Sequence, residues 1–481
     1  MLASKLLKEE YNLESDIDIT GIVYDSRLTV PGNVFVCIKG YEQDGHKYAK
    51  MAEAMGASMI VAEDPVDVDI PVCYVSDSRK TIARMAAEFY GNPSKKFKLI
   101  GVTGTNGKTT VTYLLQSILE TAGKRVGVIG TNENIIGDKV LLTKSTTPTT
   151  PNALELQKLF AEMVEEEAQY VVMEVSSHAL YLDRVYGCAY DVGIFTNLTQ
   201  DHLDFHKTME NYMEAKAKLF DISESGAINF DDEYAKRIIE SDKRADLLTY
   251  GLNKGADVLA ENINITARGV TFDVLYKDEV YPMQLCIPGK FSVYNALSAI
   301  TCAIQLGLDM ETIAEGLRQA KGVMGRVEVV PTDTDYTVII DYAHTPDGLE
   351  NIINAVTEYA EGRVITLFGC GGDRDNSKRA IMGEIAGRLS DFSIITSDNP
   401  RTENPAAIIA EIEEGMKRTD GEYVVVENRR DAIEYGLKMA EPGDILVLAG
   451  KGQETYQIIG KEKFDFDERV VVCEALKKIA E

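Results

Sequence analysis

The chain has 481 residues, 45% of them hydrophobic and 26% charged, and its formal net charge is −27. This length predicts about three domains, each large enough for its own core. The acidity argues against nucleic acid or an anionic membrane as a partner, because both require a basic protein face. An anionic substrate would have to be held by local lysines and arginines.

The seven cysteines are scattered, and no pair has Cys-x-x-Cys spacing. They predict neither a zinc cluster nor a disulfide framework, and they favour a reducing compartment. The first residues lack the apolar core of a signal peptide, and no run of about 18 apolar residues predicts a membrane span. We therefore expect a cytoplasmic protein.

The first part of the chain, residues 1–95, alternates short apolar strands with helical patterns and ends in a linker of chain breakers and charges. This alternation predicts an α/β domain. The expected strands are 22–23, 34–38, 58–62 and 71–75, and the expected helices are 48–55 and 81–90.

The most informative segment lies between an expected strand at 97–102 and an expected helix at 111–119. Its sequence is Thr103-Gly104-Thr105-Asn106-Gly107-Lys108-Thr109-Thr110. Its glycines let backbone N–H groups close on a phosphate, the helix start adds its dipole, Lys108 adds charge and Thr109 offers a hydroxyl to Mg²⁺. The spacing is shorter than in the standard phosphate loop. An ordinary strand-to-helix turn is the alternative, but the flanking elements favour a nucleoside-triphosphate site.

Apolar runs at 170–175 and 192–196 predict two buried parallel strands, each followed by polar residues. Glu174, near the end of the first strand, is placed to bind Mg²⁺, the alternative being a solvent-facing acid. After the second strand, His202 is a candidate ligand for another metal ion, and His206 is expected only to pack or hydrogen-bond. On an expected helix at 211–220, spacing alone indicates that both lysines, Lys216 and Lys218, lie on a solvated face.

Past Gly325-Arg326 a third α/β pattern begins, and it predicts a doubly wound sheet with sites at the carboxyl ends of its strands. Residues 368–374 resemble a dinucleotide fingerprint, but Arg374 replaces the third glycine, so we reject a nicotinamide site. Asp398-Asn399-Pro400-Arg401 suits a ligand with amino and carboxylate groups, and a capped turn is the alternative. The expected strands are 337–341, 363–368, 392–396 and 444–448, preceded by a helix at 293–306.

From end to end, the chain resembles the Mur ligase family. The resemblance rests on the phosphate loop and on residues 174–178, 197–202, 212–220, 325–328, 341–346 and 371–374. It implies three α/β domains: an N-terminal uridine-nucleotide-binding domain (1–95), a central P-loop ATP-binding domain with a mostly parallel sheet (96–327), and a C-terminal Rossmann-like domain that binds an amino acid (328–481).

The resemblance implies an ATP-dependent ligase that adds meso-2,6-diaminopimelate to UDP-N-acetylmuramoyl-L-alanyl-D-glutamate through an acyl phosphate. This reaction belongs to cytoplasmic peptidoglycan synthesis, and hence to cell-wall biogenesis, cell shape and cell division. The alternatives are the same reaction with L-lysine or another diamino acid, a folate-polyglutamating ligase, and a P-loop ATPase switch. We expect small-molecule substrates, a monomer, and neither a nucleic-acid nor a membrane partner.

The resemblance also assigns the nucleotide and metal contacts. Thr109 and Glu174 would hold one Mg²⁺, and His202 another together with Lys216. Lys216 would be N6-carboxylysine, a carbamate whose negative charge replaces an ammonium that would repel the metal. The implied ATP contacts are Gly104, Thr105, Asn106, Gly107, Lys108, Thr109, Thr110, Asn295, Arg326, Asp341 and His344.

The remaining implied contacts bind the two substrates that are joined. In the amino-acid pocket, Arg401 would pair with the distal carboxylate and Glu454 would face the distal ammonium. Two departures from the family pattern are Leu182, where some relatives have glutamine, and Gln453, where histidine is usual. The muramoyl-dipeptide contacts are Ser26, Arg27, Thr146, Thr147, Ser176 and Arg184, and the amino-acid contacts are Arg374, Asp398, Asn399, Arg401, Gly450 and Glu454.

Overall fold

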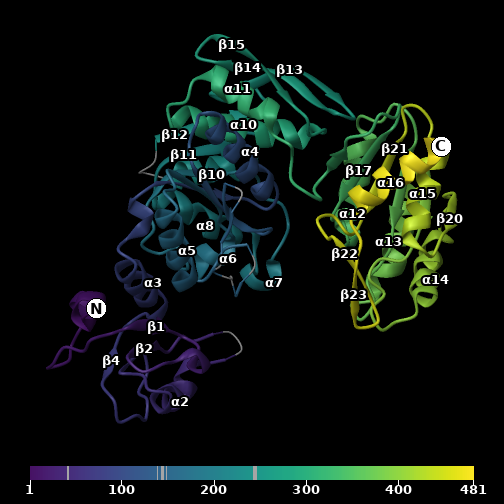
Figure 1. The fold of residues 1–481 in the computed structure, drawn as a ribbon. Helices are drawn as coiled ribbons and strands as arrows, with labels where there is room; N and C mark the ends of the chain where they lie inside the picture. The colour runs from purple at the N-terminus through teal and green to yellow at the C-terminus, as the bar shows by residue number, and fades with distance from the viewer. Residues whose placement is uncertain are drawn as a thin grey trace. The chain divides into compact units, whose positions relative to one another are not determined.

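The computed structural model describes residues 1–40, 43–137, 139–141, 143, 146–147, 149–241 and 246–480 (Figure 1). Contacts divide the chain into two compact units. The first unit comprises Met1–Leu259 and Leu297–Gly316, and the second comprises Ala260–Ala296 and Leu317–Glu481. Strand β13 (Val258–Thr266) and helices α10 (Lys290–Gln305) and α11 (Met310–Gln319) cross the boundaries between the units.

The first sheet of the first unit has four parallel strands in the order β1-β2-β3-β4. Helices α1 and α3 pack on one face and α2 on the other, so the central strands are buried along their whole length. The elements are β1 (Gly21–Val23), β2 (Asn33–Val36), β3 (Met59–Ala62), β4 (Val72–Tyr74), α1 (Ala3–Leu7), α2 (Ala49–Ala54), α3 (Ser78–Phe89), and the 3₁₀ turns η1 (Lys8–Glu10), η2 (Ser26–Leu28), η3 (Gly45–Tyr48) and η4 (Pro93–Lys95).

The second sheet of this unit has the order β12-β11-β10-β5-β9-β6-β7-β8, and the first residues of β13 pair with β12. Strand β7 runs antiparallel to its neighbours β6 and β8, and the other neighbouring pairs are parallel, as predicted for the strands around the phosphate loop. The elements are β5 (Lys98–Thr103), β6 (Val126–Ile129), β7 (Asn134–Ile136), β8 (Lys139–Val140), β9 (Tyr170–Glu174), β10 (Tyr190–Phe195), β11 (Ser223–Asn229), β12 (Asp246–Gly251), α4 (Lys108–Thr121), α5 (Ala153–Glu165), α6 (Ser177–Tyr181), α7 (Leu203–His206), α8 (Met209–Asp221) and α9 (Ala235–Ser241).

The second unit contains a six-stranded sheet in the order β16-β17-β21-β18-β19-β20, parallel except for β16. Helices α12, α13 and α14 pack on one face, and α15 and α16 on the other (Figure 1). The elements are β16 (Glu328–Val330), β17 (Thr337–Asp341), β18 (Val364–Phe368), β19 (Phe392–Ile395), β20 (Tyr423–Val425), β21 (Ile445–Ala449), β22 (Tyr456–Ile459), β23 (Glu462–Asp465), α12 (Pro346–Thr357), α13 (Ser377–Leu389), α14 (Pro405–Met416), α15 (Arg429–Met439) and α16 (Glu468–Ala480).

One part of the second unit departs from the predicted alternation of strands and helices. Strands β14 (Gly269–Tyr276) and β15 (Glu279–Leu285) form an antiparallel hairpin. Their sequences alternate between buried and exposed residues, a pattern typical of a sheet with one solvated face.

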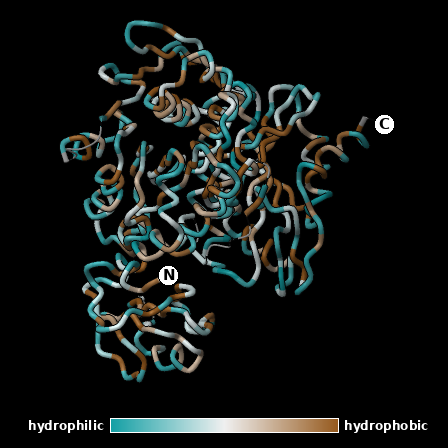
Figure 2. Tube along the Cα trace, turned by 60° about the vertical axis from the view of Figure 1, so that its left-hand side comes forward, coloured by the Kyte–Doolittle hydropathy of each residue, from teal (hydrophilic) through white to brown (hydrophobic). Residues whose placement is uncertain are grey.

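The hydropathy of the chain follows this layered architecture. Hydrophobic stretches run through the interior, while loops and outer turns are hydrophilic (Figure 2). Because parallel strands share one direction, their carboxyl ends meet at one edge of each sheet, where ligand sites form in doubly wound proteins. No helix in the described portion of the chain has the length and apolar character needed to cross a bilayer.

Candidate active site

The phosphate loop joins the carboxyl end of β5 to the first residue of α4, which is Lys108. Gly104 has φ +148°, and a Cβ there would lie 1.9 Å from Thr196 Oγ1, so a side chain cannot be accommodated. The loop after β10 holds the phosphate loop, because Asn197 accepts hydrogen bonds from the backbone N–H groups of Thr105 and Asn106, both at 2.9 Å. Because Asn197 engages these two N–H groups, a phosphate would be held by the N–H groups nearer the start of α4.

Two side chains that carry oxygen atoms, Thr109 and Glu174, lie together beside this loop. Thr109 Oγ1 donates to Glu174 Oε1 at 2.9 Å, and Thr131 N donates to the same oxygen at 2.9 Å. Glu174 is 1% exposed and forms no ion pair with any described residue. A buried carboxylate without a counter-ion, next to a hydroxyl, fits Mg²⁺, which prefers hard oxygen ligands.

Lys216 lies against the same loop and is 1% exposed, so its assignment to a solvated face was wrong. Its Nζ donates to Gly104 O at 2.7 Å, and Lys108 Nζ donates to that carbonyl at 3.0 Å. Burial, together with repulsion from Lys108, holds the pKa of Lys216 well below its usual value. The sequence carried a signal for this, because Tyr212, Lys216 and Phe220 share one buried stripe of α8. Lys218 is exposed, as expected.

The histidines after β10 differ in their surroundings. The His202 side chain is 47% exposed, and its Nε2 lies 3.4 Å from Asp201 Oδ2. His206 is buried and its Nε2 lies 2.9 Å from Ser177 Oγ, which confirms the prediction that it packs and hydrogen-bonds. No group of three or more His, Cys, Asp or Glu side chains suited to a metal ion occurs among the residues with a described position. A second metal at His202 therefore stays a prediction.

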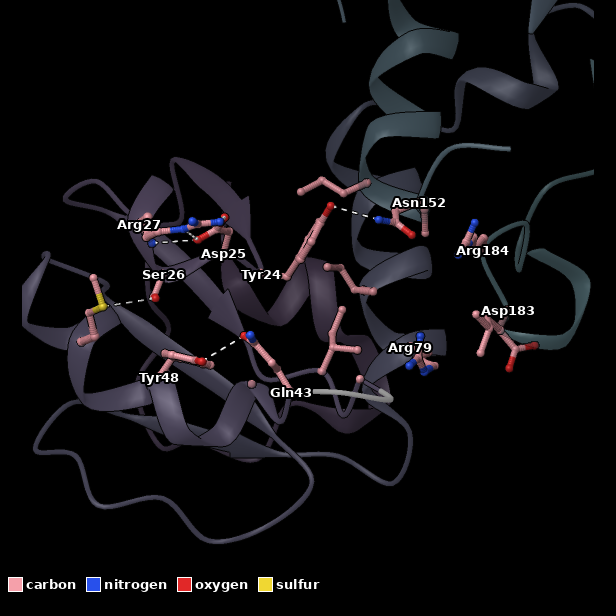
Figure 3. Close-up of a pocket in the computed structure, with 18 residues that line it drawn as sticks. Tyr24, Asp25, Ser26, Arg27, Gln43, Tyr48, Arg79, Asn152, Asp183 and Arg184 are labelled. Atoms are coloured by element: carbon pink, nitrogen blue, oxygen red, sulfur yellow. Dashed lines mark hydrogen bonds and ion pairs between the residues drawn. The ribbon is translucent and has the colours of Figure 1, made fainter. Parts of the chain in front are cut away.

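A cavity of about 640 Å³ lies between the first sheet and the segments at 152–154 and 182–184 of the same unit (Figure 3). Of the predicted substrate contacts, Ser26, Arg27 and Arg184 line it. Arg27 is paired with Asp25 at 2.7 Å, whereas Arg184 and Arg79, which also lines the cavity, form no ion pair with any described residue. Two guanidinium groups without acidic partners suit an anionic ligand.

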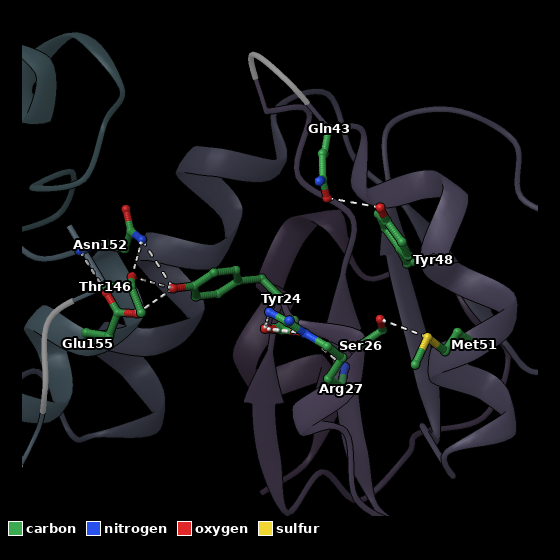
Figure 4. Close-up of polar contacts among 10 residues, drawn as sticks. Tyr24, Ser26, Arg27, Gln43, Tyr48, Met51, Thr146, Asn152 and Glu155 are labelled. Carbon is green, nitrogen blue, oxygen red and sulfur yellow. Dashed lines mark hydrogen bonds and ion pairs between the residues drawn. The ribbon is translucent and has the colours of Figure 1, made fainter. Parts of the chain in front are cut away.

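Tyr24 and Asn152, which line this cavity, belong to a hydrogen-bond network centred on the Tyr24 hydroxyl (Figure 4). The Tyr24 hydroxyl donates to the Glu155 carboxylate and accepts from Asn152 Nδ2 at 3.1 Å. Thr146 Oγ1 accepts from the same Asn152 amide at 3.0 Å. Burial and the Glu155 carboxylate raise the pKa of Tyr24. Sequence reasoning missed Tyr24 and Asn152, although the Asn-x-x-Glu spacing at the start of α5 is a capping-box signal.

Thr150, also missed, connects three predicted substrate contacts and is fully buried. Its carbonyl accepts from Thr147 Oγ1 at 2.9 Å and from Arg184 Nη1 at 3.1 Å. Its hydroxyl accepts from Ser176 N at 3.0 Å. The structure therefore brings Thr147, Ser176 and Arg184 together, and Leu182 contributes to the wall of the nearby cavity.

In the second unit, the predicted amino-acid contacts meet at the carboxyl ends of β18, β19 and β21. Asn399 Nδ2 donates to Glu454 Oε2 at 2.8 Å, and Arg401 Nη1 donates to Gly372 O at 2.8 Å. Asp398 and Asn399 are buried, whereas Arg374 is exposed. Arg401 forms no ion pair with any described residue, so its charge is available to a ligand.

Two of the predicted nucleotide contacts, Arg326 and Asp341, lie beside this pocket. The Arg326 guanidinium lies 5.2 Å from the centre of the Tyr342 ring, and Asp341 Oδ2 accepts from Val327 N at 2.8 Å. Burial raises the pKa of Asp341. A Cβ on Gly325 would lie 2.1 Å from Gln453 N, so the 325–326 turn packs directly on the loop after β21. Two further predicted contacts are an exposed residue, His344, and a buried residue of α10, Asn295.

Comparison with known proteins identifies the family. The UDP-N-acetylmuramoyl-L-alanyl-D-glutamate--2,6-diaminopimelate ligase of Clostridium botulinum is 49% identical over 485 residues, which cover 99% of each chain. The chain belongs to the Mur ligase family. The Mur ligase middle domain matches residues 102–303, the Mur ligase glutamate ligase domain matches 325–452, and the Mur ligase family catalytic domain matches 18–90.

Two further Mur ligases support the same assignment. A ligase of the same name from Caldanaerobacter subterraneus subsp. tengcongensis is 50% identical over 475 residues, covering 98% of each chain. A solved structure of a ligase of that name is 31% identical, with a TM-score of 0.77 and 99% of each chain covered. The predicted three-domain α/β architecture with mostly parallel sheets is confirmed, and the boundaries at 95/96 and 327/328 stay predictions.

Proposed function

We propose that this Mur ligase uses ATP to join meso-2,6-diaminopimelate to the D-glutamate of UDP-N-acetylmuramoyl-L-alanyl-D-glutamate. The observation that carries the proposal is the pocket at Arg401, whose guanidinium forms no ion pair with the part of the chain that the structure describes. It lies in the same loop as Asn399, which holds Glu454. A diamino diacid supplies a carboxylate to the Arg401 guanidinium and an ammonium to the Glu454 carboxylate. The names of the relatives at 49% and 50% identity support the same substrates.

The chemistry follows from the poor electrophilicity of a carboxylate. Transfer of the γ-phosphoryl group of ATP to the D-glutamate side chain gives an acyl phosphate and ADP. Attack by the amine of diaminopimelate then forms the amide, releasing phosphate and a proton. Lys108, at the centre of the phosphate loop, stabilises charge on the transferring group. Mg²⁺, held by Thr109 and Glu174, would supply further charge neutralisation on the phosphates.

Lys216 is the residue we propose to be carbamylated. Only an unprotonated amine adds CO₂, and the lowered pKa of Lys216 favours that form. The product is an anion beside the phosphate loop, and with His202 it would provide ligands for a second Mg²⁺. The UDP-muramoyl substrate would occupy the cavity that Arg79, Arg184 and Ser26 line. We propose a cytoplasmic monomer.

Phosphate release in the presence of each substrate alone and of all three together tests this function. We expect turnover only when ATP, the UDP-muramoyl-dipeptide and diaminopimelate are combined, with an amide product visible by mass spectrometry. Parallel assays with L-lysine distinguish this function from its nearest alternative, a lysine-adding ligase. A basal ATPase rate that ignores the muramoyl-dipeptide would instead indicate a P-loop switch.

Tyr24→Phe is expected to raise the KM for the UDP-muramoyl substrate about three- to tenfold with little change in kcat. The substitution removes one hydroxyl and leaves Glu155 and Asn152 without that partner, a loss of about 0.6–1.4 kcal/mol. Initial rates at varied concentrations of the UDP-muramoyl substrate give this KM. Tyr48→Phe is the matched control, because Tyr48 lines the same cavity and donates to Gln43 Oε1 at 3.0 Å. Equal KM values in both variants would contradict the assignment of Tyr24.

A further inference from the structure

Lys451 is a fully buried lysine beside the residues proposed to bind the amino acid. Its exposed fraction is 0%, and it follows Gly450 in the loop after β21. Its Nζ lies 3.1 Å from Glu454 Oε2, 3.3 Å from Asn399 Oδ1 and 3.7 Å from Asp398 Oδ1. A buried ammonium is costly unless it is paired and hydrogen-bonded, and here its partners are three predicted contacts of the amino acid.

The partners of Lys451 come from two different loops. Asp398 and Asn399 follow β19, whereas Glu454 follows β21. The Asn399 side chain closes the connection, because its Nδ2 donates to Glu454 Oε2 while its Oδ1 accepts from Lys451 and from Ile458 N. The ammonium is therefore a cross-link between the two loops that form the pocket.

This cross-link holds one oxygen of Glu454 and leaves the other available. Oε2 accepts from Lys451 and from Asn399, whereas Oε1 accepts a hydrogen bond from no described residue. The Glu454 side chain is 19% exposed, so a ligand can reach it. A carboxylate fixed through one oxygen presents the other in a defined direction.

The backbone beneath Lys451 is also anchored. Arg429 and Glu468 form a fully buried ion pair at 2.8 Å, and Arg429 Nη2 donates to the carbonyl of Ala449 at 2.9 Å. Ala449 is the last residue of β21, two positions before Lys451. The lysine thus extends from a fixed strand end toward the two carboxylates, and its position is defined from both sides.

We propose that Lys451 is a positioning residue for amino-acid selectivity: it orients Glu454 toward the distal ammonium of the incoming diamino acid. The inference rests on the proposed function, because it takes diaminopimelate as the substrate. Without the ammonium, Asp398 and Glu454 would repel each other across the pocket, and Glu454 would no longer be held through Oε2. Recognition of the distal ammonium would weaken, while binding of ATP at the phosphate loop would not.

The test compares meso-diaminopimelate with 2-aminopimelate, which keeps the distal carboxylate and lacks the distal ammonium. In Lys451→Met we expect the KM for diaminopimelate to rise about 10- to 100-fold and the KM for ATP to stay within about twofold. The preference for diaminopimelate over 2-aminopimelate, as a ratio of kcat/KM values, should fall about tenfold. Lys463→Met is the control, because Lys463 is exposed and lies 3.5 Å from the centre of the Tyr456 ring.

Lys451→Gln provides a second variant that keeps a hydrogen-bond donor and loses the charge. Lys451→Gln can replace Lys451→Met in the test if Lys451→Met does not fold. We expect the same loss of preference in Lys451→Gln. An unchanged preference in either folded variant, whatever the fall in rate, would overturn the inference and leave Lys451 a structural residue. Failure of the wild-type enzyme to join diaminopimelate would instead overturn the proposed function.

Discussion

Lys216→Ala is expected to lower the rate of amide formation by about a thousandfold or more. The side chain is buried against the carbonyl of Gly104, and its carbamate would be an anionic ligand beside the phosphate loop. If a group that holds a metal is removed, the metal no longer stabilises the charge on the phosphates and no longer positions them. Product formation at saturating substrates, measured by mass spectrometry, gives the size of the loss.

Rescue distinguishes a missing carboxylate from a damaged fold. Formate or acetate can occupy the space of the lost carbamate and should restore part of the activity of Lys216→Ala. Lys218→Ala is the matched control, because Lys218 lies on the same helix but is exposed. In the wild type, ¹³C-labelled bicarbonate should give a carbamate signal that Lys216→Ala lacks. Undiminished activity of Lys216→Ala without any added acid would refute the carbamate.

The features that sequence reasoning found are local ones. The strand-to-helix transition at 103–110 and the acid at Glu174 follow from apolar runs bounded by glycines and polar residues, and the structure has both at the predicted strand ends. The parallel strands were predictable because strands buried on both faces are continuously apolar. Ile339 packs on one face of its sheet, and Val338 and Ile340 pack on the other.

The features that sequence reasoning missed depend on contacts between distant segments. Tyr24 meets Glu155 across 131 positions, and Lys451 meets Asn399 across 52. No local spacing encodes such pairs. Lys216 is intermediate, since its place in a buried helical stripe was visible but a lysine there is ordinarily assigned to solvent. A polar residue such as Lys216, at a position where the helical pattern predicts burial, was therefore the most informative departure from that pattern.

Arg401→Met is expected to lower kcat/KM for diaminopimelate about a hundredfold to a thousandfold. We propose the guanidinium as the partner of the distal carboxylate, and truncating one member of a charge pair that the bound substrate would bury costs roughly 2–5 kcal/mol. Lysine has no distal carboxylate and would leave Arg401 without a counter-ion in the wild-type enzyme. The variant removes that penalty, so the preference for diaminopimelate over lysine should fall by a similar factor.

The backbone of Arg401 explains why the effect should be this large. Its φ of +50° is uncommon for a residue with a side chain, and two hydrogen bonds hold it: Arg401 N to Ile458 O at 3.1 Å and Gly460 N to Arg401 O at 2.7 Å. These bonds fix the backbone, and the hydrogen bond from Nη1 to Gly372 O at 2.8 Å orients the guanidinium, so the side chain loses little entropy on binding its ligand. Arg418→Met, which removes an exposed arginine paired with Glu384, is the control. If wild type and Arg401→Met discriminate equally between the two amino acids, selection must come from another part of the pocket.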